Sequence, residues 1–451
     1  MSRLGPFAAL AAAAALSACS TVSNVGDAVW PFNDSEAPTQ TAPDEGRISI
    51  LAFEQQLTPD PQLAGRTIAA PPAAPVQWTQ PGGTVDNTPV NVEGTADLSV
   101  VSRSGLGAGS NENVRIAAPP VVGEGKLFFL DADHRVRAVD AATGHEIWSR
   151  SLRPRDSDDH RARGGGVAFS AGRVYVTTGF GFAVSLDANS GEEVWRSRVG
   201  APFHAAPTVA GARVYAVTND NELVALDAAT GVQQWSYQSI AESARILSAS
   251  SPAVDGETVI APFASGELTA FLAANGRRLW TDALSRSGRL TSLSAINDIA
   301  GRPAVDGGVV YAASHSGILA AVDMRSGQRV WSRAFASTQT PWVAGDVLYA
   351  VTVDGELAAI DRESGGVVWL KQLRRFEDEE DRKGRVAWTG PIMVGGKLVL
   401  ANSLGEVVAV SPETGDVTAE RDLHQPIFIP PIASGGNIYI VTDEARLVIL
   451  R

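Results

Sequence analysis

The sequence predicts an all-β fold built from eight copies of one repeating unit, and three features indicate it. A short apolar segment with a glycine turn recurs along the chain, a motif ending in tryptophan follows most copies, and short strands of alternating polarity lie between them. Glycine is abundant (44 residues) and tryptophan frequent (10 residues), which suits many tight turns and one recurring aromatic position. Self-similarity with a period of about 20–50 residues is typical of stacked repeats.

The first half of each unit is a proline, an apolar pair, a glycine turn and a β-rich run. Seven copies begin with a proline, namely Pro120, Pro207, Pro252, Pro303, Pro341, Pro391 and Pro431. An eighth copy without the proline begins at Val167. The sequence therefore contains eight units.

The second half of each unit reads Asp-x-x-Thr/Ser/Asn-Gly-x-x-x-Trp. The aspartate accepts hydrogen bonds from the backbone two residues further on, and the glycine adopts the left-handed conformation that closes the turn. We expect these residues to be structural and the tryptophan to pack between neighbouring units. The full copies are Asp140–Gly144–Trp148, Asp187–Gly191–Trp195, Asp227–Gly231–Trp235, Asp323–Gly327–Trp331 and Asp361–Gly365–Trp369. The copy with Gly276 and Trp280 has Leu272 in place of the aspartate, and the copy from Ser411 to Ala419 has lost both Asp and Trp.

A second turn precedes each aspartate position, as at Asp220-Asn221 and Asp354-Gly355, and separates two alternating strands. Each unit thus has four short antiparallel strands, which is one blade of a β-propeller. The sequence therefore predicts an eight-bladed propeller, because a single blade cannot cover its own apolar face. The last unit has only three strands before the chain stops, so we expect Ala96–Ser102 to supply the fourth and to close the ring.

Residues 1–18 have the features of a signal peptide, with an apolar run, Phe7–Leu16, that is too short to span a bilayer. The run ends in Leu16-Ser-Ala-Cys19, which resembles the bacterial lipobox and contains the only cysteine of the chain. We expect Cys19 to be lipidated, with its acyl chains as a membrane anchor. Ser20 in place of an aspartate is typical of sorting to the outer membrane. The alternative is an ordinary secretory signal with a chance cysteine.

Residues 19–75 are rich in proline and alanine and are expected to form a mostly extended, lipidated tether, which leaves 76–451 for the propeller. One part of the tether is more apolar than a free linker. It comprises Ile48–Phe53 followed by Leu57 and Leu63, and we expect it to pack along the propeller.

The tryptophan motif resembles the tryptophan-docking repeat of quinoprotein dehydrogenases rather than WD40, because Trp148 and Trp331 are followed by serine instead of aspartate. Together with the lipobox, the eight repeats from Trp78 to Arg451 resemble the BamB family of the outer-membrane β-barrel assembly machinery. The segments beginning at Trp78 and Ile116 are similar to that family's first propeller residues.

This resemblance implies a non-enzymatic scaffold without a cofactor, anchored by lipid in the outer membrane and facing the periplasm. Its implied partners are the barrel insertase BamA, other subunits of the machinery and unfolded outer-membrane protein clients. The negative net charge of −13 opposes nucleic-acid binding, which requires a basic surface.

In the BamB family, two neighbouring segments contact BamA. The family's Leu-x-Leu-Arg element corresponds to Ala244–Leu247, and its Asp-x-Asp element corresponds to Asp298–Ala300, which keeps only the first aspartate. These departures put the detailed contacts in doubt, and packing between blades is the alternative at each position. The partner-binding residues that the resemblance implies are Arg245, Ile246, Leu247, Arg289, Ile296, Asn297 and Asp298.

Two other functions remain open. A quinone-dependent dehydrogenase shares the blade number and the tryptophan motif, but it normally needs a calcium site, a catalytic aspartate and often a disulfide, and no cysteine remains once Cys19 is lipidated. A scaffold of another cell-envelope complex is the second. No metal site is expected, because the histidines are scattered without ligand spacing, at His134, His145, His160, His204, His315 and His424.

Overall fold

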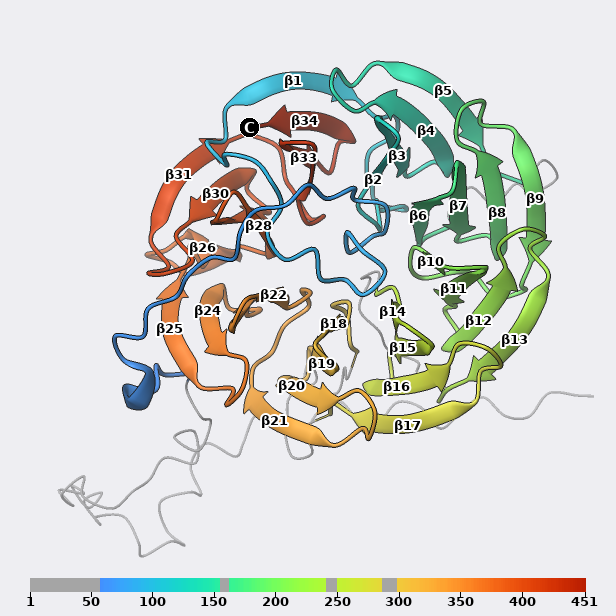
Figure 1. Cartoon of the computed structure of the whole chain (residues 1–451). Coiled ribbons are helices and arrows are strands. Elements are labelled where there is room, and N and C mark those ends of the chain that lie inside the picture. The colour runs from blue at the N-terminus through green and yellow to red at the C-terminus, as the bar shows by residue number, and fades with distance from the viewer. Residues whose placement is uncertain (1–56, 155–161, 241–249, 286–297) are drawn as a thin grey trace, which may run out of the picture. The chain divides into compact units, whose positions relative to one another are not determined.

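A four-stranded antiparallel sheet is repeated eight times around a central channel (Figure 1). The computed structural model describes residues 57–154, 162–240, 250–285 and 298–451. In each sheet the first strand lies nearest the channel and the fourth lies on the outside of the ring. The predicted eight-bladed propeller is therefore confirmed.

The blades are numbered here in chain order. The strands of blades one to four are β2 (Val121–Gly123), β3 (Lys126–Leu130), β4 (Arg135–Asp140), β5 (Glu146–Ser151); β6 (Gly165–Ser170), β7 (Arg173–Thr178), β8 (Phe182–Asp187), β9 (Glu193–Arg198); β10 (Thr208–Ala210), β11 (Arg213–Val217), β12 (Glu222–Asp227), β13 (Gln233–Gln238); β14 (Ala253–Asp255), β15 (Thr258–Pro262), β16 (Glu267–Leu272) and β17 (Arg278–Ala283).

The strands of blades five to eight are β18 (Ala304–Asp306), β19 (Val309–Ala313), β20 (Ile318–Asp323), β21 (Arg329–Ala334); β22 (Trp342–Ala344), β23 (Val347–Val351), β24 (Glu356–Asp361), β25 (Val367–Gln372); β28 (Trp388–Val394), β29 (Lys397–Asn402), β30 (Glu406–Val410), β31 (Val417–Asp422); β32 (Ile432–Ser434), β33 (Asn437–Val441), β34 (Arg446–Leu450) and β1 (Val100–Gly105). A small hairpin of β26 (Phe376–Asp378) and β27 (Lys383–Arg385) lies between blades six and seven.

Burial differs between the strands of a blade because neighbouring blades cover both faces of the inner ones. In blade three, the central residues of β12 are all buried, whereas β13 alternates between exposed and half-buried positions. Small and β-branched side chains such as Val224 and Ala225 suit this two-sided packing. The outer strand pairs on one side only, with Trp235 opposite Ala225.

The ring is closed by pairing the two ends of the propeller, as the sequence predicts. β1 runs antiparallel to β34, with Val100 opposite Leu450. The strand begins four residues later than the expected Ala96–Ser102, because Ala96 and Leu98 have φ angles of 54° and 57°, which do not belong to an extended strand.

Each motif tryptophan packs on the following blade, which confirms its predicted role. Trp195 donates a hydrogen bond from Nε1 to the carbonyl oxygen of Ala228 at 3.0 Å. Its indole covers Gly231, where a Cβ atom would come within 2.5 Å of the ring. Six successive interfaces repeat this arrangement, in the pairs Trp148–Gly191, Trp195–Gly231, Trp235–Gly276, Trp280–Gly327, Trp331–Gly365 and Trp369–Gly415.

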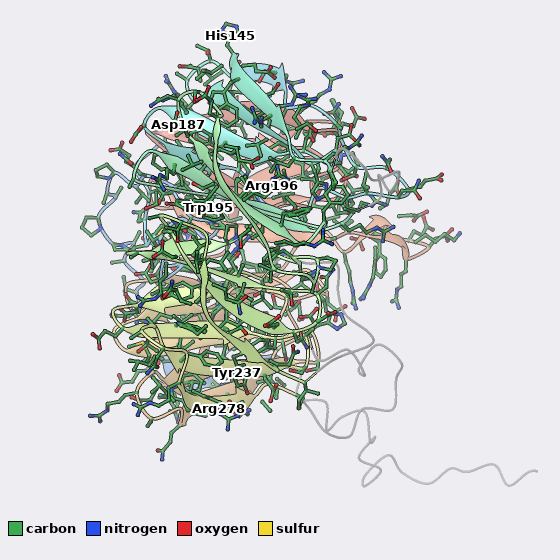
Figure 2. The ribbon with its side chains drawn as sticks, turned by 90° about the vertical axis from the view of Figure 1, so that its right-hand side faces the viewer. His145, Asp187, Trp195, Arg196, Tyr237 and Arg278 are labelled. Carbon is green, nitrogen blue, oxygen red and sulfur yellow. The ribbon has the colours of Figure 1, made fainter. Side chains whose placement is uncertain are left out.

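Polar contacts across the outside of the ring add to these packed interfaces. Tyr237 of blade three accepts a hydrogen bond at 3.1 Å from the guanidinium of Arg278 in blade four, and the two side chains lie together in Figure 2. Asp187 and the buried Trp195 of blade two are on the side of the ring that faces the viewer in Figure 2.

Residues 76–92, called the N-terminal belt here, run once around the channel and bond to the innermost strand of every blade. The belt crosses the middle of the ring in Figure 1, at the end where the first and second strands of each blade are joined. The hydrogen-bonded pairs, in blade order, are Trp78–Val122, Thr79–Phe169, Gln80–Val209, Val85–Val254, Asp86–Val305, Val90–Trp342, Val92–Met393 and Val76–Ser434.

The residues before the belt contact blade six. The backbone N–H of Asp60 donates to the carbonyl of Val367 at 2.7 Å, next to the 3₁₀ turn η3 (Pro61–Leu63). Leu57 packs against the apolar side chains of blades five and six, and Leu63 lies against Gly366. Packing along the propeller is thus confirmed for these two leucines. The apolar run 48–53 lies outside the described residues.

Residues Gln56–Arg451 form one compact unit. The signal peptide 1–18 and the lipidation site Cys19 lie outside the described residues. The boundary at 75/76 between tether and propeller stays a prediction.

The tryptophan contacts predict that a methyl group on the docking glycine destabilises the ring. Gly231→Ala should lower the free energy of unfolding by about 1–3 kcal/mol more than Gly211→Ala. Both glycines have positive φ angles, so both variants carry the same kind of backbone strain, but a Cβ at Gly211 meets no atom within 4 Å. Urea denaturation of the two variants measures the difference. Equal losses would contradict the role assigned to the indole contact.

The belt predicts a second effect on stability. The buried side chain of Gln80 donates to the carbonyl of Phe169 at 3.1 Å and accepts from the N–H of Val209 at 2.9 Å, joining blades two and three. Gln80→Leu should cost about 1–3 kcal/mol, because it leaves these backbone groups without partners. Gln77→Leu, at an exposed position of the same belt, is the control and should change thermal unfolding little.

Candidate protein-binding surface

The two ends of the ring differ in what covers them. In an antiparallel four-strand blade, the turns between strands one and two and between three and four lie at one end, and the connections to the next blade lie at the other. The belt crosses the first end. The connections that contain the predicted partner-binding residues, β13 to β14 and β17 to β18, lie at the second, which is called the connection face below.

Six of the seven predicted partner-binding residues fall in segments 241–249 and 286–297, outside the described residues. They are Arg245, Ile246, Leu247, Arg289, Ile296 and Asn297. The residues that follow the two segments are described and lie together. The hydroxyl of Ser250 donates to the carbonyl oxygen of Gly301 at 2.9 Å. The residues just before blades four and five are therefore in contact.

Asp298, the seventh predicted residue, is buried, with only 5% of its surface exposed. Its carbonyl oxygen accepts a hydrogen bond from the N–H of His315 at 3.0 Å. It lies just before Gly301 in the chain, where the segment 286–297 meets blade five.

The motif aspartates lie at the opposite end of the ring and stabilise turns, as predicted. Asp227 accepts hydrogen bonds from the N–H groups of Ala229 and Thr230 at 3.0 and 2.9 Å and from the Thr230 hydroxyl at 2.8 Å. The hydroxyl and N–H of Thr230 hold the pKa of Asp227 below its ordinary value. The same turn forms around Asp140, Asp187, Asp323 and Asp361.

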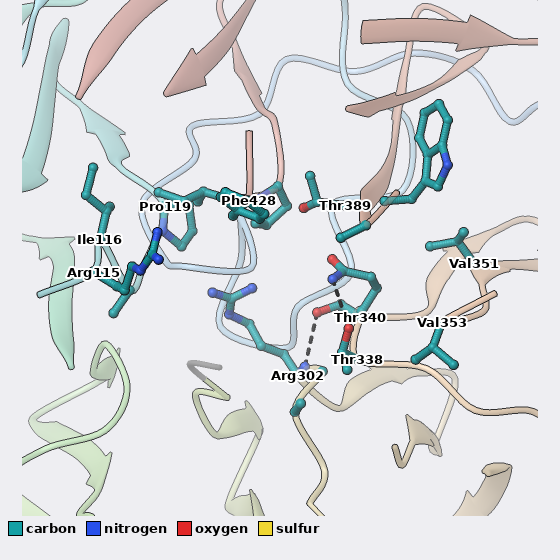
Figure 3. A pocket seen from close by; sticks show the side chains of 18 of the residues that line it. Arg115, Ile116, Pro119, Arg302, Thr338, Thr340, Val351, Val353, Thr389 and Phe428 are labelled. Atoms are coloured by element: carbon teal, nitrogen blue, oxygen red, sulfur yellow. Dashed lines mark hydrogen bonds between the residues drawn. The ribbon is translucent and has the colours of Figure 1, made fainter. Parts of the chain in front are cut away.

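A cavity of about 470 Å³ lies in the channel (Figure 3). Its lining includes Val351 at the end of β23 and Val353 in the β23–β24 turn, which is at the connection-face end of blade six. Residues just before the first strands of blades one, five, six, seven and eight also line the cavity. At its mouth Arg115 and Asp443 form an ion pair at 3.2 Å. Deeper in the channel is Arg302, which also lines a smaller space beneath the belt. Sequence reasoning missed this cavity, since Gly301-Arg302-Pro303 looks like any other start of a blade.

The histidines do not gather into a site within the described ranges. His134 is buried, its Nε2 accepts a hydrogen bond from the N–H of Gly179 at 3.1 Å, and burial lowers its pKa to about 4. His145 and His424 are exposed, and His160 lies outside the described residues. In that part of the chain, no group of three or more His, Cys, Asp or Glu side chains is placed to hold a metal ion. Nor does the described part contain a helix long and apolar enough to cross a membrane.

The outer strands present exposed aliphatic side chains around the ring. Each of these strands pairs along one edge only. The exposed positions immediately before the tryptophan site are Ile147, Val194, Leu279 and Val330, and Val417 occupies a similar place on β31. Such an edge offers backbone donors and acceptors to an added strand.

Comparison with known proteins points to one family. A family model described as outer membrane protein assembly factor BamB matches residues 132–371. The BamB protein of Moranella endobia (strain PCIT) is 25% identical over 342 residues, covering 73% of this chain and 83% of the relative.

Two solved structures are similar in fold. The crystal structure of BamB from Moraxella catarrhalis has a TM-score of 0.65 and 21% identity and covers 78% of this chain and 99% of that one. A europium-containing methanol dehydrogenase has a TM-score of 0.66 and 15% identity and covers 82% and 90%. At these identities the likeness shows the fold alone.

The lowered pKa of Asp227 predicts pH-dependent stability. A folded-state pKa below the unfolded one means that the ionised carboxylate stabilises the fold above about pH 4 and that this stabilisation is lost as the pH falls through the folded value. Asp227→Ala should therefore lower the melting temperature clearly at pH 7 and much less at pH 3. Asp255→Ala, at an exposed position outside the motif, is the control. If Asp227→Ala lowers the melting temperature equally at both pH values, the ionised carboxylate does not have the stabilising role assigned to it.

Proposed function

The chain belongs to the BamB family of outer membrane protein assembly factors, and from this premise we propose that it is a non-enzymatic lipoprotein subunit of the outer-membrane β-barrel assembly machinery. In this role it binds the barrel insertase BamA and assists the folding and insertion of outer-membrane proteins. The observation that carries the proposal is the family match over blades one to six, on a ring of eight blades.

Residues 1–18 direct export in this proposal, Cys19 carries the lipid, and the tether 19–75 joins the anchor to the propeller. The protein is thus held at the outer membrane and faces the periplasm. The described end of the tether contacts blade six, and the belt covers one end of the channel. This arrangement supports a role for the connection face as the surface for protein partners.

The proposed BamA contact surface comprises residues 243–247 and 289–299. Its support is the family resemblance of these segments and the Ser250–Gly301 contact, which brings the residues following each segment together. An aliphatic centre at Ile246 and Leu247, flanked by Arg245 and Arg289, has the composition of a small interface core with a charged rim.

Unfolded barrel clients are proposed to add strands to the outer edges of the blades. The unpaired edges of the fourth strands and their exposed aliphatic residues support this mode of binding. Crosslinkers placed at Val194 and Val330 should capture clients during export. Clients that crosslink to the propeller but never at a blade edge would contradict this mode.

Mild solubilisation of membranes, followed by affinity purification of the full chain and identification of the co-purifying proteins, tests the main proposal. Recovery of the barrel insertase supports it. Recovery of a different envelope complex without the insertase favours the alternative function, a scaffold of another cell-envelope complex. Binding of pyrroloquinoline quinone with alcohol-dependent dye reduction would instead favour the dehydrogenase.

A pair of variants tests the contact surface. Ile246→Glu should reduce recovery of the insertase at least tenfold, since losing about 1.4 kcal/mol of binding free energy already gives this factor. Val232→Glu places the same charge at an exposed aliphatic residue in a turn at the opposite end of the ring and should leave recovery unchanged. Undiminished recovery with Ile246→Glu, from a protein that melts like the wild type, would overturn the assigned surface.

A further inference from the structure

Arg302 is a buried cation without a counter-charge among the described residues. Only 6% of its surface is exposed, yet its guanidinium makes no hydrogen bond or ion pair with the residues that the structure describes. The backbone N–H of Arg302 donates to the Thr340 hydroxyl at 3.1 Å. Figure 3 shows the guanidinium projecting into the channel cavity.

Such a group is costly to bury. An ionised side chain removed from water is normally paired with an opposite charge or saturated with hydrogen bonds. Burial lowers the pKa of Arg302 to about 10, so the side chain still carries its charge at neutral pH. The nearest lining carboxylate is no substitute, because Asp443 already pairs with Arg115 at the cavity mouth. A bound anion would remove this energetic cost.

A second buried polar group faces the same cavity. The hydroxyl of Thr389, a residue with 2% of its surface exposed, has no hydrogen-bond partner among the described residues. Two uncommitted donors thus come from different blades, five and seven, and line one space.

The cavity wall is mixed, with somewhat more apolar than polar surface. Its apolar lining comprises Ile116, Val351, Val353, Trp388, Phe428 and Ile429. Phe428 is half exposed, and its ring stands beside the cavity in Figure 3. A volume of about 470 Å³ is within the usual range for small-molecule sites. Apolar side chains beside a few donors favour a ligand that has one charged end.

We propose that this cavity binds a carboxylate attached to an apolar group, with Arg302 and Thr389 donating hydrogen bonds to the carboxylate oxygens and the apolar group lying against the side chains near the mouth. The planar guanidinium matches a carboxylate in two parallel hydrogen bonds. The carboxylate can belong to a small organic acid or to the C-terminus of an extended peptide. This site is separate from the proposed insertase contact, so either can fail without the other.

Ligand-observed ¹⁹F NMR of the full chain in detergent, with 4-fluorophenylacetate as the probe, tests the site. The acid should bind, and its uncharged amide should bind at least tenfold more weakly. Arg302→Met should weaken binding of the acid about 10- to 100-fold, the range expected for loss of a hydrogen bond to a charged group. Because Arg302→Met is measured in the same detergent, its signal also shows how much of the probe enters the micelles.

Two controls separate binding from folding. Arg302→Met should melt at or above the wild-type temperature, because it removes an unpaired buried charge. Arg103→Met, at an exposed position of the outer strand β1 and outside the cavity lining, should leave the affinity unchanged. Acid and amide of equal affinity, or an Arg302→Met variant that binds the acid as the wild type does, would overturn the proposal.

Competition identifies the source of the carboxylate. Displacement of the probe by an acetylated tripeptide ending in leucine, but not by its C-terminal amide, points to a chain end. Displacement by hexanoate alone points to a small acid. Inorganic phosphate that competes as well as hexanoate would show a site for any anion and would refute the apolar half of the proposal.

Discussion

The contact between an indole and a glycine in the next blade is the interaction on which the ring depends. Six of eight interfaces use it, and in each the indole N–H donates to the carbonyl of the residue that follows the aspartate position. The glycine serves two needs at once. It takes a positive φ to close the turn, and it lacks the Cβ that would collide with the ring. Because both partners occur in the same motif, one repeated sequence specifies both sides of the interface.

The two interfaces without tryptophan lie on either side of blade eight, which combines the first and last strands of the propeller. This arrangement explains why the motif is missing there. Blade eight has its third and fourth strands at opposite ends of the propeller sequence, so it has no turn carrying the motif glycine. Blade seven accordingly needs no tryptophan and has Ala419 there. On the other side, β1 presents Ser104 to Gly144 of blade one. Closure relies instead on the β1–β34 ladder and on the belt, which bonds to all eight blades.

The sequence predicted the features that repeat locally, and it did not predict those that depend on contacts between distant segments. Blade number, turns and tryptophan contacts were predictable because each unit repeats the same local pattern. The loss of Asp at Leu272 is tolerated because the backbone bond from Gly276 N–H to its carbonyl remains, at 2.9 Å. The belt was not predictable, since its bonds, which use mainly backbone groups of a non-repeating segment, reach strands up to several hundred residues away. The sequence did not single out Arg302, because an unpaired buried charge is recognised only from the residues that surround it in the fold. The predicted partner residues rest on the family resemblance, and of these the structure describes Asp298 alone.

The belt also makes the two ends of the channel unequal, and this bears on function. A ring of similar blades would by itself leave both ends open. The belt crosses one end, and Arg302 lines both the channel cavity and the small space beneath the belt. The mouth of the cavity lies on the connection face, toward which the proposed BamA segments also lead. A partner docked there would cover or adjoin the mouth. Occupancy of the cavity and protein binding would then influence each other equally in both directions, since coupling between two binding sites is reciprocal.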